Sequence, residues 1–221
     1  QAQRWRAVRA LLLLMGDSGL RIAEAAATRR PELEWLPTDG DVPPTWLLQV
    51  IGKGDRERFV PVSDECIAAL QAHWRDRGLD FAAPDACAPL VAPLVIPATK
   101  KARRKFGLDA GKNDVTGVPL QEGYSVRGAR GLTSWAIRQM LEHLTDLNEL
   151  ERRQLARTSP HALRHTFGTQ SVAADVPLDV VQRIMGHASL QTTTTYVTAE
   201  RRRMRAEVAK YHARLTGSGQ K

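Results

Sequence analysis

The chain has 221 residues, and its 32 lysines and arginines outnumber its 24 aspartates and glutamates, which gives a formal net charge of +8. With 43% hydrophobic residues it can bury one core, which excludes a wholly disordered chain. The longest apolar run, at residues 10–15, is much too short to span a membrane, and no signal peptide is recognisable. Two cysteines, Cys66 and Cys87, are too few for a disulfide framework, so we expect a reducing, cytoplasmic environment.

The positive charge favours a nucleic-acid partner. Only 5% of the residues are aromatic, which argues against binding single strands by base stacking and favours duplex DNA held through its phosphates. The cations gather at residues 100–105 and again at 201–203. A solvated surface is the alternative explanation for either cluster. The residues predicted to contact DNA are Lys100, Lys101, Arg103, Arg104 and Lys105.

The first third of the chain alternates helical and extended patterns. Gly52-Lys53-Gly54-Asp55 separates two strand-like segments and predicts a β-hairpin with Lys53 at or beside its tip. In chain order the predicted elements are helices at 4–15 and 20–28, a short strand near 32–36, strands at 45–51 and 58–62, and a helix at 64–77.

Residues 79–131 are rich in proline and glycine, and we interpret them as an irregular insertion of short strands and loops. Beyond them Ser159-Pro160 is a helix start, and Gly186 is a helix stop. The predicted helices are 132–144, 147–157, 161–174, 177–185, 189–196 and 199–215, followed by a flexible tail at 216–221. The fold class is therefore α+β and mainly helical, with one small antiparallel sheet.

Several polar side chains stand at or near the ends of these elements. Each has an ordinary structural explanation when taken alone, since a lone histidine, arginine or tyrosine is more often a surface or packing residue. They are Arg21, Lys53, His161, Arg164, His187 and Tyr196.

Together these residues match a known pattern. His161-Ala162-Leu163-Arg164-His165 resembles the H-x-L-R-H motif of tyrosine recombinases, the phage integrase family. Residues 178–189 resemble that family's LGH-S box, and residues 192–197 resemble its nucleophile block. Residues 18–24 and 52–58 are similar to its first arginine box and its hairpin lysine. The resemblance spans residues 1–214 apart from 79–131, in the right order and with the right spacing.

The resemblance implies a tyrosine-recombinase catalytic domain at residues 1–215, with the family's N-terminal core-binding domain absent from this chain. It implies site-specific DNA recombination on duplex DNA, by a tetramer on paired sites, without a metal or another cofactor. The isolated fragment is expected to be able to exist as a monomer, and the segment 199–215 to be able to dock on a neighbouring protomer.

The resemblance also implies a role for each site residue. Tyr196 attacks a backbone phosphodiester and forms a 3′-phosphotyrosyl link. Arg21 and Arg164 clamp the non-bridging oxygens, a task that suits the paired donors of guanidinium. His187 hydrogen-bonds a non-bridging oxygen. The proton-transfer residues are Lys53, at the departing 5′-oxygen, and His161, near the tyrosine.

Alternatives stay open at this stage. A type IB topoisomerase-like enzyme would use the same residue types, a retired recombinase would bind DNA without cleaving it, and a generic basic protein would do neither. Tyr124 and Tyr211 are alternative nucleophiles by residue type. We interpret Glu24 as positioning Arg21 or capping a helix, and His165 as structural and facing another side of its helix than Arg164.

Overall fold

The computed structural model describes residues 1–52, 57–83, 87–96, 99–106, 120 and 122–186. Within them the chain forms a mainly helical α+β domain with one three-stranded sheet, as predicted. The elements are α1 (Ala2–Gly16), α2 (Ile22–Ala27), a 3₁₀ turn (Arg30–Glu32), β1 (Leu33–Leu36), β2 (Thr45–Ile51), β3 (Glu57–Val62), α3 (Asp64–Asp76), α4 (Lys100–Phe106), α5 (Val126–His143), α6 (Glu149–Arg157), α7 (Pro160–Ala173) and α8 (Leu178–Met185).

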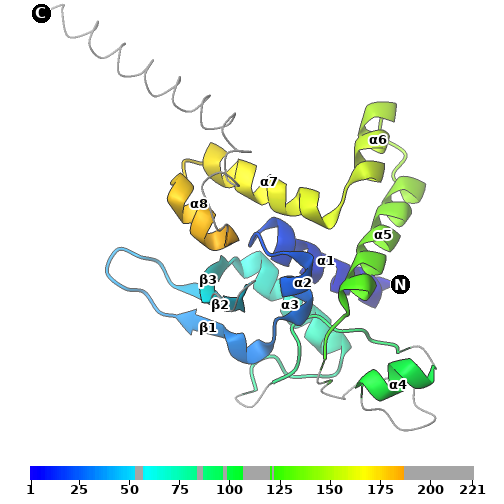
Figure 1. Cartoon of the computed structure of the whole chain (residues 1–221), viewed down its shortest axis with the longest axis horizontal. Coiled ribbons are helices and arrows are strands. Elements are labelled where there is room, and N and C mark those ends of the chain that lie inside the picture. The colour runs from blue at the N-terminus through cyan, green and yellow to red at the C-terminus, as the bar shows by residue number, and fades with distance from the viewer. Residues whose placement is uncertain (53–56, 84–86, 97–98, 107–119, 121, 187–221) are drawn as a thin grey trace, which may run out of the picture.

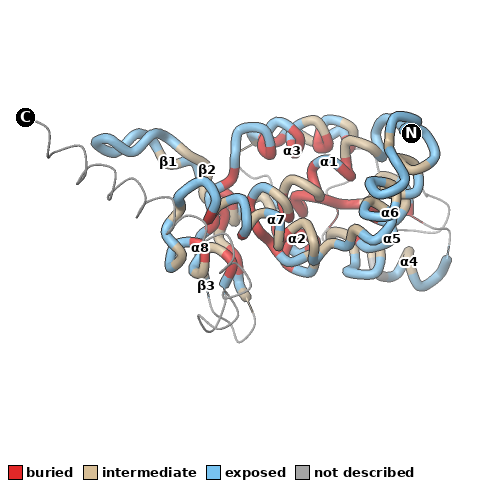
Figure 2. The backbone as a smooth tube through the Cα atoms, turned by 90° about the horizontal axis from the view of Figure 1, so that it is seen from above, coloured by how far each residue is buried: buried red, intermediate tan, exposed pale blue. Residues whose placement is uncertain are grey.

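Helix α1 is the centre of the molecule (Figure 1). It packs against α3, α5 and α7, and its Leu11, Leu14 and Met15 are at most 1% exposed. This packing accounts for the continuous apolar run at residues 10–15, which is typical of a helical segment covered on several sides, whereas Arg4 and Arg9 earlier in the helix are exposed. Figure 2 shows the buried residues concentrated around α1 and α2, whereas α4 and α6 lie at the edge and are largely exposed.

The sheet is antiparallel in the order β1-β2-β3. Alternation along β3 directs Val60 and Val62 into the core and leaves Phe59 53% exposed on the other face. Arg58 falls on the same face as the two valines, which places a guanidinium group beside the core. The β3 edge of the sheet contacts α8, and through this contact the hairpin approaches the C-terminal helices.

The interpretation of residues 79–131 as short strands and loops was only partly right: residues 79–83, 87–96 and 122–125 are irregular, but the described part also holds helical residues. Helix α4 forms within them, and α5 begins at Val126 rather than at 132. Gly128 and Gly131 suggested a break, but Ser125 caps the helix by accepting from the Gly128 N–H, and the packing of α5 on α1 and α2 outweighs the low helix propensity of glycine. The described residues of this segment form no strand, only isolated bridges.

Ala88, Leu90 and Val91 belong to the main core, and Ala92, which follows them, packs in a small second cluster with Ile96 and Leu120. Three side chains at the C-terminal end of α3 hold this strip, residues 88–92, in place. Trp74 Nε1 donates to Leu90 O at 3.0 Å, and Arg77 Nη1 donates to Pro89 O at 2.7 Å. His73 Nε2 accepts from the Ala92 N–H at 3.2 Å. This strip reaches back to α2, since the Leu90 N–H donates to Thr28 O. A stretch with no periodicity of its own is thus held by polar side chains of a neighbouring helix.

The remaining boundaries agree closely with prediction. Strand β2 has the predicted limits, and α6 and α8 start one or two residues later than expected. Ser159 accepts from the Ala162 N–H, as its predicted N-cap role requires. The predicted helices at 189–196 and 199–215 and the tail lie outside the described residues. No helix among the described residues is both long and apolar enough to cross a membrane.

Candidate active site

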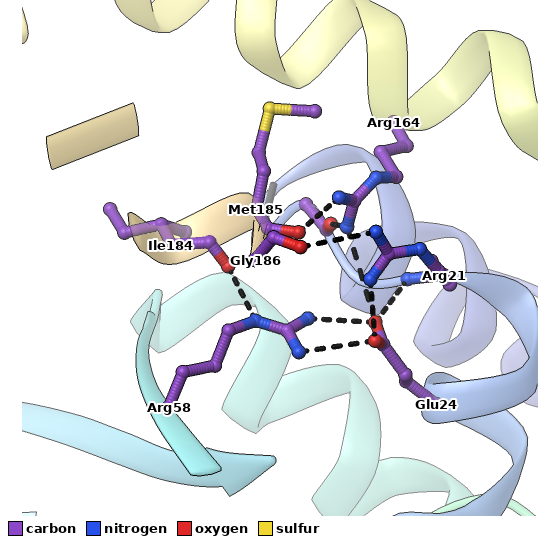
Figure 3. Close-up of polar contacts among 8 residues, drawn as sticks. Arg21, Glu24, Arg58, Arg164, Ile184, Met185 and Gly186 are labelled. Atoms are coloured by element: carbon purple, nitrogen blue, oxygen red, sulfur yellow. Dashed lines mark hydrogen bonds and ion pairs between the residues drawn. The ribbon is translucent and has the colours of Figure 1, made fainter. Parts of the chain in front are cut away.

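Glu24 lies at the centre of a cluster of arginines (Figure 3). Arg21 is the N-cap of α2 and Glu24 its third residue, and the Glu24 carboxylate caps the helix start: the Arg21 N–H donates to Glu24 Oε2 at 2.7 Å. The Arg21 side chain also donates from Nη1 to Oε1 at 2.9 Å. Both interpretations of Glu24, as a cap and as a residue that positions Arg21, are confirmed.

Arg58 of β3 is the second partner of Glu24. Its Nη1 and Nη2 donate to the two carboxylate oxygens at 3.1 and 2.7 Å, while its Nε donates to Ile184 O at 2.7 Å. The side chains of Arg58 and Glu24 are 10% and 8% exposed. One guanidinium group therefore ties the hairpin to α2 and to the end of α8.

Arg164 is the third arginine, and it is only 3% exposed. It donates from Nη1 to Gly19 O and from Nη2 to Met185 O, and its Nη1 lies 4.0 Å from Glu24 Oε2. Arg21 donates from Nη2 to Gly186 O at 3.3 Å. Since Met185 and Gly186 are consecutive, the guanidinium groups of Arg21 and Arg164 converge on one turn of the chain (Figure 3).

Two glycines make this convergence possible. Gly19 and Gly186 have φ of +67° and +61°, a conformation that side chains disfavour. A Cβ at Gly19 would lie 2.5 Å from Phe167 Cδ1, and one at Gly186 would lie 3.1 Å from Arg58 Cδ and Nε. Both glycines offer their carbonyl groups to the arginines, so their conformation sets where the guanidinium groups are held.

The cluster has one carboxylate for three guanidinium groups. Burial opposes ionisation of Glu24, but the hydrogen bonds from Arg58 and Arg21 outweigh it, so that the pKa of Glu24 lies below its ordinary value. An ionised Glu24 neutralises one of the three positive charges, and the cluster keeps an excess of positive charge. An arrangement of this kind suits an anion such as a phosphodiester.

His161 and His165 form a pair on one face of α7. Their Nε2 atoms are 2.7 Å apart and their rings meet edge to face at 4.2 Å between centroids. We expected His165 to be structural, and its contact with His161 was missed, although an i, i+4 spacing on a helix could have indicated it. Burial, then the charges of His161 and Arg164, lowers the pKa of His165, which favours the neutral imidazole.

His161 and Arg21 line one cavity of about 560 Å³ between α2, α5 and the start of α7. The side chain of Arg21 is 43% exposed, and His161 is also exposed, so both are open to solvent there. Arg164 is not among the residues that line this cavity and lies in the buried cluster. The structure thus brings together three of the six predicted site residues.

Lys53, His187 and Tyr196 lie outside the described residues, and their roles stay predictions. One described sequence neighbour connects to the arginine cluster: Gly186, which precedes His187, accepts from Arg21. The sequence reasoning did not single out Arg58. The sequence signal that could have indicated Arg58 is its position two residues before Val60 in a strand, which places it on the same inward face as Val60 and Val62.

The predicted DNA-contacting cluster lies on α4, away from the arginine cluster (Figure 1). Lys100, Lys101 and Arg104 line a second cavity of about 530 Å³ together with Glu122. Arg103 belongs to the same short helix, and nothing further is described for the side chain of Lys105. In the described part of the chain no group of three or more histidine, cysteine or acidic residues is arranged to hold a metal ion.

Comparison with known proteins decides the family. Residues 5–203 match the phage integrase family. The chain belongs to the phage integrase family. This match spans the arginine cluster, the histidine pair and the predicted nucleophile block, and so confirms the resemblance on which the site residues were predicted.

Similar members of the family include two tyrosine recombinases XerC. One, from Bradyrhizobium diazoefficiens, is 30% identical over 207 residues, which are 93% of this chain and 50% of that protein. The other, from Pelotomaculum thermopropionicum, is 31% identical over 209 residues, 95% of this chain and 55% of that protein. The chain therefore spans about half the length of these relatives.

Solved structures confirm the fold. The XerH site-specific recombinase, in a post-cleavage complex with a palindromic difH substrate, aligns with a TM-score of 0.54 and 17% identity over 96% of this chain and 48% of its own. The XerA recombinase aligns with a TM-score of 0.53 and 19% identity over 94% of this chain and 63% of its own.

Proposed function

We propose that this chain is the catalytic domain of a site-specific DNA recombinase that cleaves and rejoins duplex DNA through a tyrosine nucleophile. The observation that carries the proposal is the convergence of Arg21 and Arg164, which are far apart in the sequence and donate to consecutive carbonyl groups. Two always-charged, multiply donating groups this close can hold one tetrahedral anion between them.

The chemistry assigned to these residues balances without an external energy source. The Tyr196 oxygen attacks the phosphorus, the bond to the 5′-oxygen breaks, and the negative charge that develops on the non-bridging oxygens is stabilised by Arg21, Arg164 and His187. Such preorganised donors contribute on the order of 3 kcal/mol each to the transition state. The covalent phosphotyrosyl link keeps the bond energy, so that another 5′-hydroxyl can be joined.

Two protons have to move in this step. The phenol of Tyr196 must lose its proton, because a group with a pKa near 10 is a poor nucleophile at neutral pH. His161 accepts it in our proposal, since the imidazole lies exposed in the cavity that Arg21 also lines. Lys53 supplies the proton that the departing 5′-oxygen takes up.

The proposal also covers the DNA substrate, the assembly that acts on it and the cellular compartment. Duplex DNA is the substrate, the cations of α4 contribute to binding its phosphates, and a tetramer acts on paired sites. The role of α4 in binding phosphates is supported by three of its cationic side chains, which gather around one cavity. We place the reaction in the cytoplasm, because two cysteines are too few for a disulfide framework and fit a reducing environment.

A nicked suicide substrate tests the proposal, because cleavage then releases a short strand and traps the covalent adduct. With a pool of nicked duplexes, we expect the wild-type chain and the Tyr211→Phe variant to form an adduct. The Tyr196→Phe variant should form none, although it should still bind duplex DNA. This chain is assayed beside a longer protein that contains it. DNA binding without any adduct would indicate a non-catalytic DNA-binding protein, and relaxation of supercoils without strand exchange would favour the topoisomerase alternative.

A further inference from the structure

One face of α5 forms a wall of the cavity that holds Arg21 and His161. Val126, Arg130 and Ser134 recur every four residues and all line it. The adjoining face of α5 is buried, with Ala129 and Ala136 at most 1% exposed. The helix is therefore fixed by its packing, and Arg130 has a defined place at the cavity.

Arg130 differs from the other arginines around the site. It is exposed and makes no hydrogen bond or ion pair with any described residue, whereas Arg21, Arg58 and Arg164 all do. Among the described residues that line the cavity, Arg21, Arg130 and His161 are basic and none is acidic. The hydroxyl-bearing residues Ser134, Thr158 and Ser159 complete its polar lining.

A guanidinium group that pairs with no described residue, in a cavity whose described lining holds no acid, attracts an anion. The cavity, at about 560 Å³, lies within the roughly 300–1,000 Å³ of pockets that hold small organic ligands, so it is larger than one phosphate group requires. Successive phosphates of a DNA strand follow at about 3.4 Å of axial rise, so a strand that presents one phosphate to Arg21 presents others close by.

We propose that Arg130 binds a second backbone phosphate of the DNA strand whose scissile phosphate lies at Arg21, and that it thereby positions the strand in the cavity. This inference rests on the proposed function, and it assigns to α5 a binding residue that belongs to none of the motifs described above. Arg130 acts on binding and alignment, not on the reacting atoms.

The test compares Arg130→Gln with Arg127→Gln. Arg127 lies on the same helix, is also exposed, and does not line the cavity, so its loss changes the net charge equally. Affinity for a short duplex is measured by fluorescence anisotropy at several salt concentrations, and thermal unfolding of each variant is followed alongside. We expect Arg130→Gln to weaken binding by about 3- to 10-fold and to reduce the slope of log K against log salt by about one, with Arg127→Gln close to wild type.

The outcomes separate the possibilities. Equal losses in the two variants would show general charge attraction and overturn the assignment, as would wild-type binding by Arg130→Gln. A lowered unfolding temperature in Arg130→Gln, with an unchanged salt slope, would show a structural role and also overturn it. If the wild-type chain binds no duplex DNA at all, the proposed function itself fails. Arg130→Lys, which keeps the charge, should recover most of the salt slope.

Discussion

Arg58 and Glu24 form a two-bonded ion pair, at 3.1 and 2.7 Å, between β3 and α2. The third donor of Arg58 holds Ile184 O at the end of α8. The pair therefore joins three segments that come together only in the folded chain, and each lies close in sequence to a predicted site residue: Lys53 before β3, Arg21 before α2 and His187 after α8.

Removal of Arg58 should destabilise the fold strongly. Arg58→Ala leaves a buried carboxylate with one of its partners gone, and breaking such a pair costs on the order of 3 kcal/mol in the free energy of unfolding. Urea unfolding measures this change. The control is Arg153→Ala, which removes an exposed ion pair with Glu149 and should cost about 0.5 kcal/mol or less. Similar costs for the two variants would show that Arg58 does not hold the segments together.

Neutralising Glu24 should separate binding from cleavage. Glu24→Gln keeps the shape of the side chain but loses the ionic partner of Arg21 and Arg58, so the two guanidinium groups are less firmly placed. We expect the rate of adduct formation to fall by up to about a hundredfold. The affinity for duplex DNA should stay or rise, because a negative charge is lost near the phosphate. An unchanged cleavage rate would show that Glu24 does not position the arginines.

Gly19 should tolerate no side chain. Gly19→Ala introduces a Cβ that meets the ring of Phe167 in a backbone conformation that costs roughly 1–2 kcal/mol for a residue other than glycine. It also shifts the carbonyl that accepts from Arg164. Thermal unfolding and adduct formation should both suffer. The matched control is Gly16→Ala, where the added Cβ meets nothing within 4 Å and stability should change little.

His73 should make the fold sensitive to mild acid. Burial, then the charge of Arg77, lowers the pKa of His73 from 6.5 to about 3, so the unfolded chain binds a proton more readily than the folded one. The stability is fully present above about pH 6.5 and falls as the pH drops towards 3, by up to about 1.4 kcal/mol per pH unit.

Urea unfolding between about pH 5 and pH 7 checks this window, in which Glu24 stays ionised because its pKa is lowered. His73→Gln should flatten the dependence of stability on pH, and the exposed His143→Gln serves as the control for losing an imidazole. His165 shifts in the same direction, so His73→Gln removes only part of the slope. A slope equal to that of the wild type would contradict a buried, neutral His73.

The sequence predicted the elements whose signals are local. The Ser159-Pro160 start of α7 and the stop at Gly186 depend on residues within a few positions, and both agree with the structure. The start of α5 was missed because Gly128 and Gly131 lower the helix propensity there, and only packing against distant helices restores it.

The residues of the candidate site also divide into those with a local sequence signal and those whose role depends on long-range contacts. Motifs indicated Arg21, His161 and Arg164 through their resemblance to a family. The role of Arg58 depends on contacts with residues far along the chain, which no local pattern displays. Arg130 likewise becomes notable only when α5 is seen to wall the cavity beside α2 and α7.

The most direct test of the account is to identify the tryptic peptide that carries DNA after cleavage of a suicide substrate. The three tyrosines fall in different peptides, because Arg183 and Arg201 bound the one with Tyr196, Arg127 ends the one with Tyr124, and Lys210 precedes Tyr211. Mass spectrometry of the wild-type adduct should find the nucleotide on the peptide Ile184–Arg201, at Tyr196. A nucleotide on either other peptide would contradict the account.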